Sequence, residues 1–303
     1  MTVLDMGLGP VNGHLVSIAL KEAVQRAMEE ARKRRSDFVE FAKPGYDAKR
    51  AEEVFTDVDR DTQDIYVHMI GECFPDAGII GEEQEPGTNI PLLIPPKNGC
   101  RAYFTLDPID GTRAYIRRQS HGVSTMVALV LDGAVIAAYI GDINSKETYG
   151  YRPGSNHVWR IIDRRNINEL LPPSPKSASE MYVMLRDPPG TYGLAARRLI
   201  KRFKNNEVMG SSIGTWMARL WKQEVGAMLL PAGIETPWDS TPIIGISQRL
   251  GYVFMRPVPR HPNGWEVYEP DLPTRLTKRK HDTLIVHGHS AHQFKVKQFA
   301  NQE

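Results

Sequence analysis

Two carboxylates three residues apart stand in the segment Leu-Asp-Pro-Ile-Asp-Gly-Thr, at the end of a predicted strand. Pro108 fixes its own φ and keeps Asp107 out of the helical region, so the backbone must turn here. Gly111 permits a further turn or a close approach to a ligand. The carboxylates of Asp107 and Asp110 can therefore converge with the carbonyl oxygen of Ile109, which predicts a site built from oxygen atoms.

Three further acidic residues, Glu82, Glu83 and Asp239, are candidates to join this site. Two carboxylates about 4 Å apart repel one another by roughly 4 kcal/mol at an effective dielectric of about 20, unless a cation lies between them. Ligands that offer only oxygen suit a hard ion such as Mg²⁺ or Mn²⁺, which keeps some of its waters and commonly acts on phosphate oxygens. The acidic residues therefore predict a divalent metal site that acts on a phosphorylated ligand.

Four acidic motifs stand in a fixed order along the chain. They are Asp59 near the start of a predicted helix, Glu82-Glu83, the D-P-I-D-G-T motif at 107–112, and Trp238-Asp239, which precedes Gly251 by eleven intervening residues. Each motif alone is also typical of a turn or of a solvated acidic pair. A tendency to form turns does not explain, however, why Trp238-Asp239, far along the chain, also stands at the spacing of the ordered set. Over residues 16–252 the ordered set resembles the inositol monophosphatase superfamily of magnesium-dependent, lithium-sensitive phosphomonoesterases.

This resemblance implies a ligand set for two or three Mg²⁺ ions per active site, with Mn²⁺ as a possible substitute. Glu82, Asp107 and the Ile109 carbonyl would hold one ion, and Asp107, Asp110 and Asp239 would hold a second. The resemblance implies the hydrolysis of a small phosphate monoester by a water molecule that the metals activate, with the second metal stabilising the leaving alkoxide.

The family pattern also implies the catalytic residues Glu82, Thr112 and Asp59. Thr112 and Glu82 would orient the attacking water, while Asp59 supports the metals. The backbone N–H groups of Gly111 and Thr112, at a predicted helix start, would receive phosphate oxygens. Glu83 is expected to have a supporting role.

Two departures from the family pattern concern the substrate. Inositol-specific members carry a glutamate seven residues before the aspartate of W-D, where this chain has Ala232, and Tyr252 replaces the second glycine after Gly251. The segment around 211–216 resembles the part of the family that lines the substrate. Its expected substrate contacts are Ser212, Gly214, Thr215 and Trp216.

Two substrates other than an inositol phosphate remain open within the same superfamily, namely a 3'(2'),5'-bisphosphate nucleotide and histidinol phosphate. Relatives that act on bisphosphate nucleotides also have a Gly-Ser-Ser segment. Trp216 could stack on a base, but its helical spacing with Leu220 is more typical of a core residue.

Two alternatives from other functional classes are less favoured. The segment 210–214 reads G-x-S-x-G, so Ser212 could be the nucleophile of a serine hydrolase with Asp239 and His287. That motif needs a well-formed strand immediately before it. Here only two apolar residues, Val208-Met209, precede the motif, and the residues before them are polar. A binding protein without catalytic activity would be expected to lack at least one of the carboxylates, whereas this chain has the full set.

Hydrophobic periodicity predicts the elements that position these residues. Helices are expected at 16–31, 56–73, 194–203, 215–222 and 241–250, and strands at 78–80, 101–106, 123–131, 134–140, 181–185, 227–230 and 283–287. The Asp132-Gly133 pair predicts a tight hairpin. Residues 170–179 are expected to form a connector and 257–273 a long loop.

The fold class expected from these elements is α/β with an α+β N-terminal half. The family resemblance implies a layered α-β-α-β-α sandwich of the inositol monophosphatase and sugar phosphatase type. We expect two domains, 1–165 with Glu82 and the D-P-I-D-G-T motif, and 166–303 with Trp238-Asp239. A homodimer is expected by analogy.

Composition limits the partners that the protein can have. The 303 residues carry 38 Lys and Arg against 36 Asp and Glu, a net charge of +2, which disfavours binding to a nucleic acid polymer. The longest apolar stretch, 126–140, is interrupted by Asp132-Gly133, which argues against a membrane span. The two cysteines and the glycine-containing start predict a cytoplasmic protein without disulfides. The family resemblance implies that its partner is a small phosphorylated metabolite.

Overall fold

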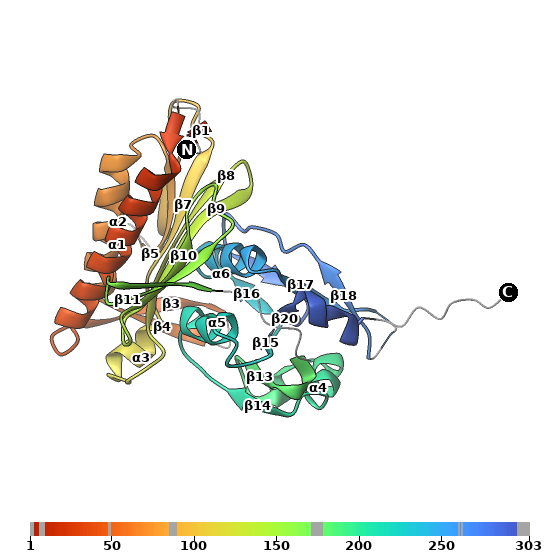
Figure 1. Cartoon of the computed structure of the whole chain (residues 1–303). Coiled ribbons are helices and arrows are strands. Elements are labelled where there is room, and N and C mark those ends of the chain that lie inside the picture. The colour runs from red at the N-terminus through yellow and green to blue at the C-terminus, as the bar shows by residue number, and fades with distance from the viewer. Residues whose placement is uncertain are drawn as a thin grey trace.

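The computed structural model describes residues 3–5, 10–47, 50–84, 90–170, 178–259, 261 and 263–295. Two large sheets dominate it (Figure 1). The eight-stranded sheet contains, in spatial order, β12 (Asn166–Leu170), β11 (Val158–Ile162), β10 (Glu147–Tyr151), β9 (Ala134–Asp142), β8 (Ser124–Leu131), β7 (Ala102–Asp110), β5 (Gly78–Gln84) and β6 (Pro91–Ile94). The six-stranded sheet contains β14 (Asn205–Val208), β13 (Tyr182–Leu185), β15 (Ala227–Leu230), β20 (Thr283–His287), β17 (Tyr252–Pro257) and β18 (Trp265–Tyr268).

Helices form three layers that alternate with these sheets (Figure 1). Helices α1 (Gly13–Lys33) and α2 (Asp57–Cys73) cover the outer face of the large sheet, and α5 (Ile213–Trp221) and α6 (Pro237–Arg249) lie between the two sheets. Helix α4 (Leu194–Ile200) packs on the far face of the smaller sheet. The predicted α-β-α-β-α sandwich is therefore confirmed.

Shorter elements connect these layers. They are β1 (Val3–Asp5), β2 (Pro10–Asn12), the hairpin β3 (Glu40–Asp47) and β4 (Arg50–Thr56), α3 (Thr112–Ile116), β16 (Gly233–Glu235), β19 (Thr277–Arg279), and the 3₁₀ helices at Ala178–Glu180, Pro189–Thr191 and Gly288–Gln293. None of the helices in the described ranges is long and apolar enough to cross a membrane.

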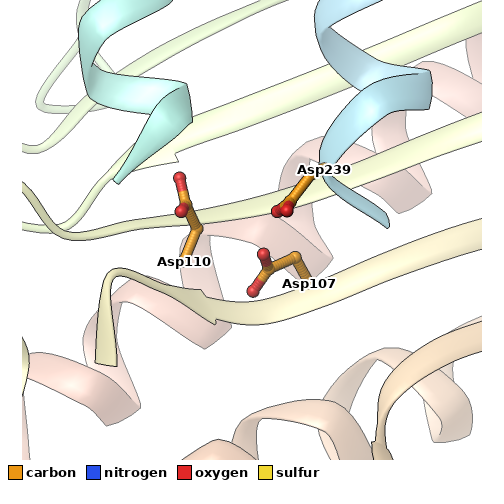
Figure 2. Close-up of side chains that lie close together, drawn as sticks. All are labelled: Asp107, Asp110 and Asp239. Carbon is orange, nitrogen blue, oxygen red and sulfur yellow. The ribbon is translucent and has the colours of Figure 1, made fainter. Parts of the chain in front are cut away.

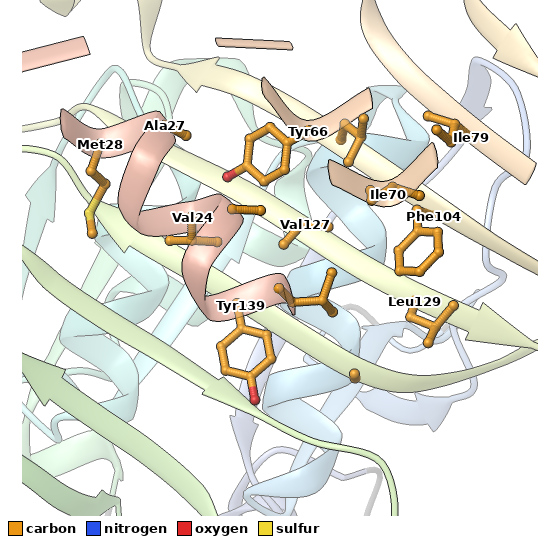
Figure 3. Close-up of a cluster of buried hydrophobic side chains, with 14 of the residues drawn as sticks. Val24, Ala27, Met28, Tyr66, Ile70, Ile79, Phe104, Val127, Leu129 and Tyr139 are labelled. Atoms are coloured by element: carbon orange, nitrogen blue, oxygen red, sulfur yellow. The ribbon is translucent and has the colours of Figure 1, made fainter. Parts of the chain in front are cut away.

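The outer core lies between α1, α2 and the large sheet (Figure 3). The apolar residues of α1 recur at helical spacing and are buried, as the sequence predicts, among them Val24 and Ala27. They pack with Tyr66 and Ile70 of α2 against strand residues such as Val127. This packing fixes the position of the sheet strands that carry the acidic residues.

The inner core lies between the two sheets and contains residues from both halves of the chain, including Met126, Trp216, Met228 and Ile285. The larger sheet extends to β12, which pairs antiparallel with β11 after residue 165. The boundary expected at 165/166 therefore cuts through this sheet, and the two halves share one core.

The structure confirms the hairpin at Asp132-Gly133, where both residues have positive φ, 52° and 76°. Helix α6 begins at Pro237, earlier than the expected start at residue 241, because proline suits the first turn of a helix. This correction places Asp239 inside the helix rather than before it.

Several other boundaries differ from the sequence expectations. The loop expected at 257–273 contains strand β18, and its residues 260 and 262 lie outside the described part. Of the connector expected at 170–179, residues 171–177 lie outside the described part as well. The hairpin β3–β4 and strands β10, β11, β12 and β14 were not anticipated. Strand β12 is exposed over most of its length, so its sequence lacks the apolar alternation that identifies a strand.

Replacing Gly245 with Ala tests the close packing of α6 on the large sheet. An added Cβ would lie 2.5 Å from Cγ1 of Val135 and 2.8 Å from the hydroxyl oxygen of Tyr151. Such overpacking costs roughly 1–3 kcal/mol, which offsets or exceeds the gain of about 1 kcal/mol that Ala brings over Gly in a helix. We expect Gly245→Ala to lower the midpoint of urea unfolding.

Gly71→Ala in α2 is the matched control, since a Cβ at that exposed helical position meets no atom within 4 Å. This variant should keep or raise the unfolding midpoint. A midpoint of Gly245→Ala that rises as much as that of Gly71→Ala would contradict the close contact between α6 and the sheet.

Candidate metal centre

An irregularity in β7 brings two aspartates of the D-P-I-D-G-T motif to one side of the sheet. Residues three apart in a regular strand point to opposite faces. Here Asp107 pairs with Met126 and Asp110 with Ser124, so β7 has one more residue than β8 between these pairs. This bulge reverses the alternation and places both carboxylates on the side of the sheet where α5 and α6 lie, with Asp110 directed at the start of α5 (Figure 2).

The third aspartate comes from the other half of the chain. Asp239 lies in the first turn of α6, where the helix dipole favours a negative charge. One oxygen from each of Asp107, Asp110 and Asp239 lies within 4.8 Å of the other two (Figure 2). The structure thus joins residues that are 132 positions apart in the sequence into one cluster.

Asp110 is held by hydrogen bonds from residues that were predicted to contact the substrate. Its Oδ2 accepts from the hydroxyls of Ser212 at 2.6 Å and Ser124 at 2.8 Å, and from the backbone N–H of Gly214 at 2.8 Å. The N–H of Ile213 donates to Oδ1 at 3.1 Å. Ser212 and Gly214 therefore lie behind the carboxylate, which corrects their expected place in the substrate pocket.

Thr215 and Trp216 are both buried. The N–H of Thr215 donates to the Ser212 hydroxyl at 3.0 Å, so Ser212 caps α5 as well as binding Asp110. Trp216 is only 1% exposed and belongs to the core between the sheets. Stacking of Trp216 on a base is therefore not available in this structure.

Close packing at two glycines fixes this hydrogen-bond network. Gly111 has φ 92°, and a Cβ there would lie 2.3 Å from the Gly122 carbonyl oxygen. A Cβ on Gly214 would lie 2.4 Å from Oγ of Ser124. Only glycine allows the turn after Asp110 and the start of α5 to approach one another so closely.

Asp59 and Thr112 form a second part of the site. Asp59 is 1% exposed, and its Oδ2 accepts from both the N–H and the hydroxyl of Thr56 at the start of α2, the capping box that the sequence predicts. Its Oδ1 faces the Thr112 hydroxyl at 3.1 Å, and that hydroxyl also lies 3.0 Å from the Ile109 carbonyl oxygen. The structure brings these three predicted residues together.

Gln63 positions the Glu82-Glu83 pair and was missed by the sequence analysis. Its side-chain amide accepts from the N–H of Glu83 at 2.9 Å and donates to the Glu83 carbonyl at 3.2 Å. A Cβ on Gly81 would lie 2.5 Å from the Gln63 oxygen. No sequence signal marks Gln63, because it recognises backbone atoms that any residue would offer.

The charge on this centre is unfavourable without a cation. Burial, followed by the charges of Glu82, Asp110 and Asp239, raises the pKa of Asp107 well above its ordinary value. Burial and the charge of Asp239 raise the pKa of Asp110 to about 7, and burial with the charge of Glu82 raises that of Asp239. Glu82 thus lies close enough to act on two of the three aspartates.

These residues fit a hard divalent cation. All of the donors are oxygen atoms, and Oδ1 of Asp107 is buried without a hydrogen-bond partner among the described residues. A buried carboxylate oxygen without a partner costs free energy that a bound cation would recover. Glu82, Asp107, Asp110 and Asp239 are the side chains that could hold it.

The serine hydrolase alternative does not fit the geometry. A strand, β14, does precede the G-x-S-x-G segment, contrary to expectation, but it is the polar edge strand of its sheet. The Ser212 hydroxyl is fully buried and bound to Asp110. His287 packs against Tyr252 and His289 instead of Ser212.

Without metal, the protein should lose stability as the pH rises, because the folded state holds protons on this centre more tightly than the unfolded chain. The raised pKa of Asp110 stabilises the metal-free folded state. This contribution to the free energy of unfolding is complete when the pH is below the ordinary pKa of an aspartate, near 3.8, and is lost as the pH rises past about 7. We expect Asp110→Asn to flatten the fall of the melting temperature between about pH 5 and pH 8, measured by fluorimetry in chelator.

Asp132→Asn is the matched control, since Asp132 is half exposed in the hairpin turn and Asn suits that turn equally well. It should keep the pH dependence of the wild type. Added Mg²⁺ should raise the melting temperature of the wild type at the higher pH, because it binds the deprotonated carboxylates. An unchanged slope in Asp110→Asn would contradict the raised pKa.

The sandwich and its acidic centre define a family. Residues 14–272 match the inositol monophosphatase family, and the chain belongs to it. Histidinol-phosphatase of Chlorobaculum parvum is 28% identical over 217 residues, which cover 67% of this chain and 73% of that protein. The family and this relative are phosphatases, so the hydrolase class expected from the sequence is confirmed.

Solved structures share the fold. The extragenic suppressor protein SuhB of Bartonella henselae superimposes with a TM-score of 0.68 at 14% identity, covering 92% of this chain and 96% of that one. A crystal structure of an IMPase/NADP phosphatase complexed with Mg²⁺ and phosphate gives a TM-score of 0.67 at 13% identity, covering 93% and 94%.

Proposed function

We propose that this chain is a Mg²⁺-dependent phosphatase that hydrolyses a small phosphate monoester. One observation carries the proposal: three aspartates from both halves of the chain, two of them buried and Asp239 partly buried, place oxygen atoms within 4.8 Å of one another. Oδ1 of Asp107, which has no hydrogen-bond partner among the described residues, supports a cation at this point. Membership of a phosphatase family supports phosphate as the group that the cation binds.

The metal ligands in this proposal are the side chains of Glu82, Asp107, Asp110 and Asp239 and the carbonyl oxygen of Ile109. Bound Mg²⁺ would lower the pKa of the attacking water and stabilise negative charge on the leaving oxygen. Asp110 can coordinate through Oδ1 because its other oxygen is occupied by three donors. Those donors hold the carboxylate in one orientation before the metal arrives.

Thr112 is proposed to relay a proton from the attacking water to the carboxylate of Asp59. Its hydroxyl carries one proton, for which Asp59 and the Ile109 carbonyl are the acceptors. As that proton passes to the carboxylate of Asp59, Thr112 Oγ takes one from the water, so the hydroxyl again has one proton and Asp59 becomes protonated. Glu82 assists by orienting the water, and the N–H groups of Gly111 and Thr112 at the start of α3 would bind phosphate oxygens.

The proposed substrate is a small phosphorylated metabolite. Simple inositol recognition is disfavoured because Ala232 replaces the glutamate expected for sugar hydroxyls. A 3'(2'),5'-bisphosphate nucleotide and histidinol phosphate are the alternatives, the second supported by the name of the Chlorobaculum parvum relative. Lithium sensitivity, a homodimer, a cytoplasmic location and the use of two or three Mg²⁺ ions stay predictions from the sequence.

Phosphate release should require a divalent cation and the aspartate cluster. We expect chelator-treated protein to be inactive on phenyl phosphate and Mg²⁺ to restore its activity. Asp107→Asn and Glu82→Gln should each lower kcat/KM by more than about 100-fold, since each removes a ligand charge. Release of inorganic phosphate from a panel of monoesters measures the effect.

Asp132→Asn should retain wild-type turnover in the same assay, because its carboxylate lies in the hairpin away from the cluster. Phosphate release by thoroughly demetallated protein would contradict the mechanism. Hydrolysis of p-nitrophenyl acetate that resists chelation and disappears in Ser212→Ala would favour the serine hydrolase instead.

A further inference from the structure

A pocket adjoins the acidic centre on the side of the smaller sheet. This pocket is partly open to solvent and shares Asp239 with the metal centre. The rest of its lining comes mainly from the smaller sheet, α6 and the two-stranded sheet β16–β19, and includes the apolar side chains of Leu230, Ile244 and Phe254. The group that leaves from phosphorus at the metal centre can extend into this pocket.

Two arginines line this pocket, and they differ in their partners. Arg279 is paired with Glu235, and both belong to the lining, so this pair adds no net charge. The guanidinium of Arg186 has neither a hydrogen bond nor an ion pair with any residue in the described part of the chain. Arg186 is therefore the cation in this pocket that is free to bind a ligand.

The backbone of Arg186 is fixed where β13 ends. Its N–H donates to the Tyr192 hydroxyl at 3.0 Å and also lies 3.3 Å from the Leu229 carbonyl, to which that hydroxyl donates at 2.8 Å. Leu230, at the end of the parallel neighbour β15, lines the same pocket. Carboxyl ends of adjacent parallel strands are a common place for ligand binding.

Charge balance favours an anion here. The positive charge of Arg186 acts on Asp239, whose pKa it lowers against the larger effect of burial. Metal ions would neutralise Asp239 and the other carboxylates, and Arg186 would then face the pocket without an opposing charge. A partly buried guanidinium in a pocket of mixed polar and apolar lining binds a carboxylate or a phosphate by charge-assisted hydrogen bonds.

We infer that this pocket selects phosphate monoesters whose leaving group carries a second anion, a carboxylate or a further phosphate, and that Arg186 binds it. This inference rests on the proposed function. A leaving group with an ammonium, as in histidinol phosphate, would meet a like charge in the pocket. The neutral hydroxyls of inositol would leave the guanidinium without a counter-charge.

Four phenyl monoesters of similar size test the inference. They are phenyl phosphate, 3-carboxyphenyl phosphate, 1,3-phenylene bisphosphate and 3-(aminomethyl)phenyl phosphate, assayed with Mg²⁺. We expect the two anionic esters to have at least roughly tenfold higher kcat/KM than the aminomethyl ester. Comparing 3-carboxyphenyl phosphate with 1,3-phenylene bisphosphate shows whether the second anion is a carboxylate or a phosphate.

Arg186→Met should lower the preference for anionic over neutral esters by roughly tenfold or more, mainly through KM, and Arg186→Lys should restore part of it. Taking the ratio between esters cancels their intrinsic reactivity and any general loss of activity. Arg197→Met, at an exposed position of α4, is the matched control and should keep the wild-type ratio.

Failure of the proposed function and failure of the role of Arg186 give different results in these assays. If no ester releases phosphate with Mg²⁺, the proposed function fails. If phenyl phosphate is hydrolysed but the ratio between anionic and neutral esters is the same in the wild type and in Arg186→Met, the phosphatase stands and the anion-binding role of Arg186 is overturned. A higher kcat/KM for the aminomethyl ester would also overturn it.

Discussion

The crowding of three mutually repelling carboxylates, two of them buried and one partly buried, is the constraint on which the rest of this structure depends. Asp107, Asp110 and Asp239 lose hydration and face one another, so the metal-free fold bears an electrostatic cost. Asp110 recovers part of that cost through donors from β8 and α5, whereas Oδ1 of Asp107 recovers none from the described residues. The protein therefore keeps a preformed site whose remaining cost a cation can remove, which is how a scaffold orients metal ligands in advance.

Such a site must be held by elements that cannot relax apart. The bulge in β7 supplies two aspartates, and α6 supplies the third from between the two sheets. The shared inner core, with Met126 from one sheet and Ile285 from the other, prevents the halves from separating to relieve the repulsion. Glycines at 111 and 214 allow the backbone contacts that side chains would block. Packing and electrostatics are thus linked, since the tight interior is what keeps the charges together.

The sequence revealed those parts of the fold whose signal is local. The period of α1, the Asp-Gly turn between β8 and β9 and the capping box at Thr56 each follow from neighbouring residues. Edge strands such as β12 could not be predicted, because an exposed strand needs no apolar alternation. The order of the acidic motifs predicted the cluster of Asp107, Asp110 and Asp239, but Ser212 and Gly214 were expected at the substrate because a sequence does not tell on which side of a carboxylate a neighbour lies. Gln63 carried no signal, since its partners are backbone atoms.

Reaction and selectivity are supplied by different parts of the chain. The carboxylates come from β7 and α6, whereas Arg186 and much of the adjoining pocket come from the ends of strands in the smaller sheet. A substitution at the end of β13 can change the charge that the leaving group meets without moving an aspartate, because the backbone there is tied to Tyr192 and Leu229 rather than to β7. One sandwich can therefore keep a fixed hydrolytic centre while its substrates diverge. Ala232 in place of the inositol-type glutamate, together with the guanidinium of Arg186, which has no partner among the described residues, agrees with the proposed recognition of an anion rather than of hydroxyls.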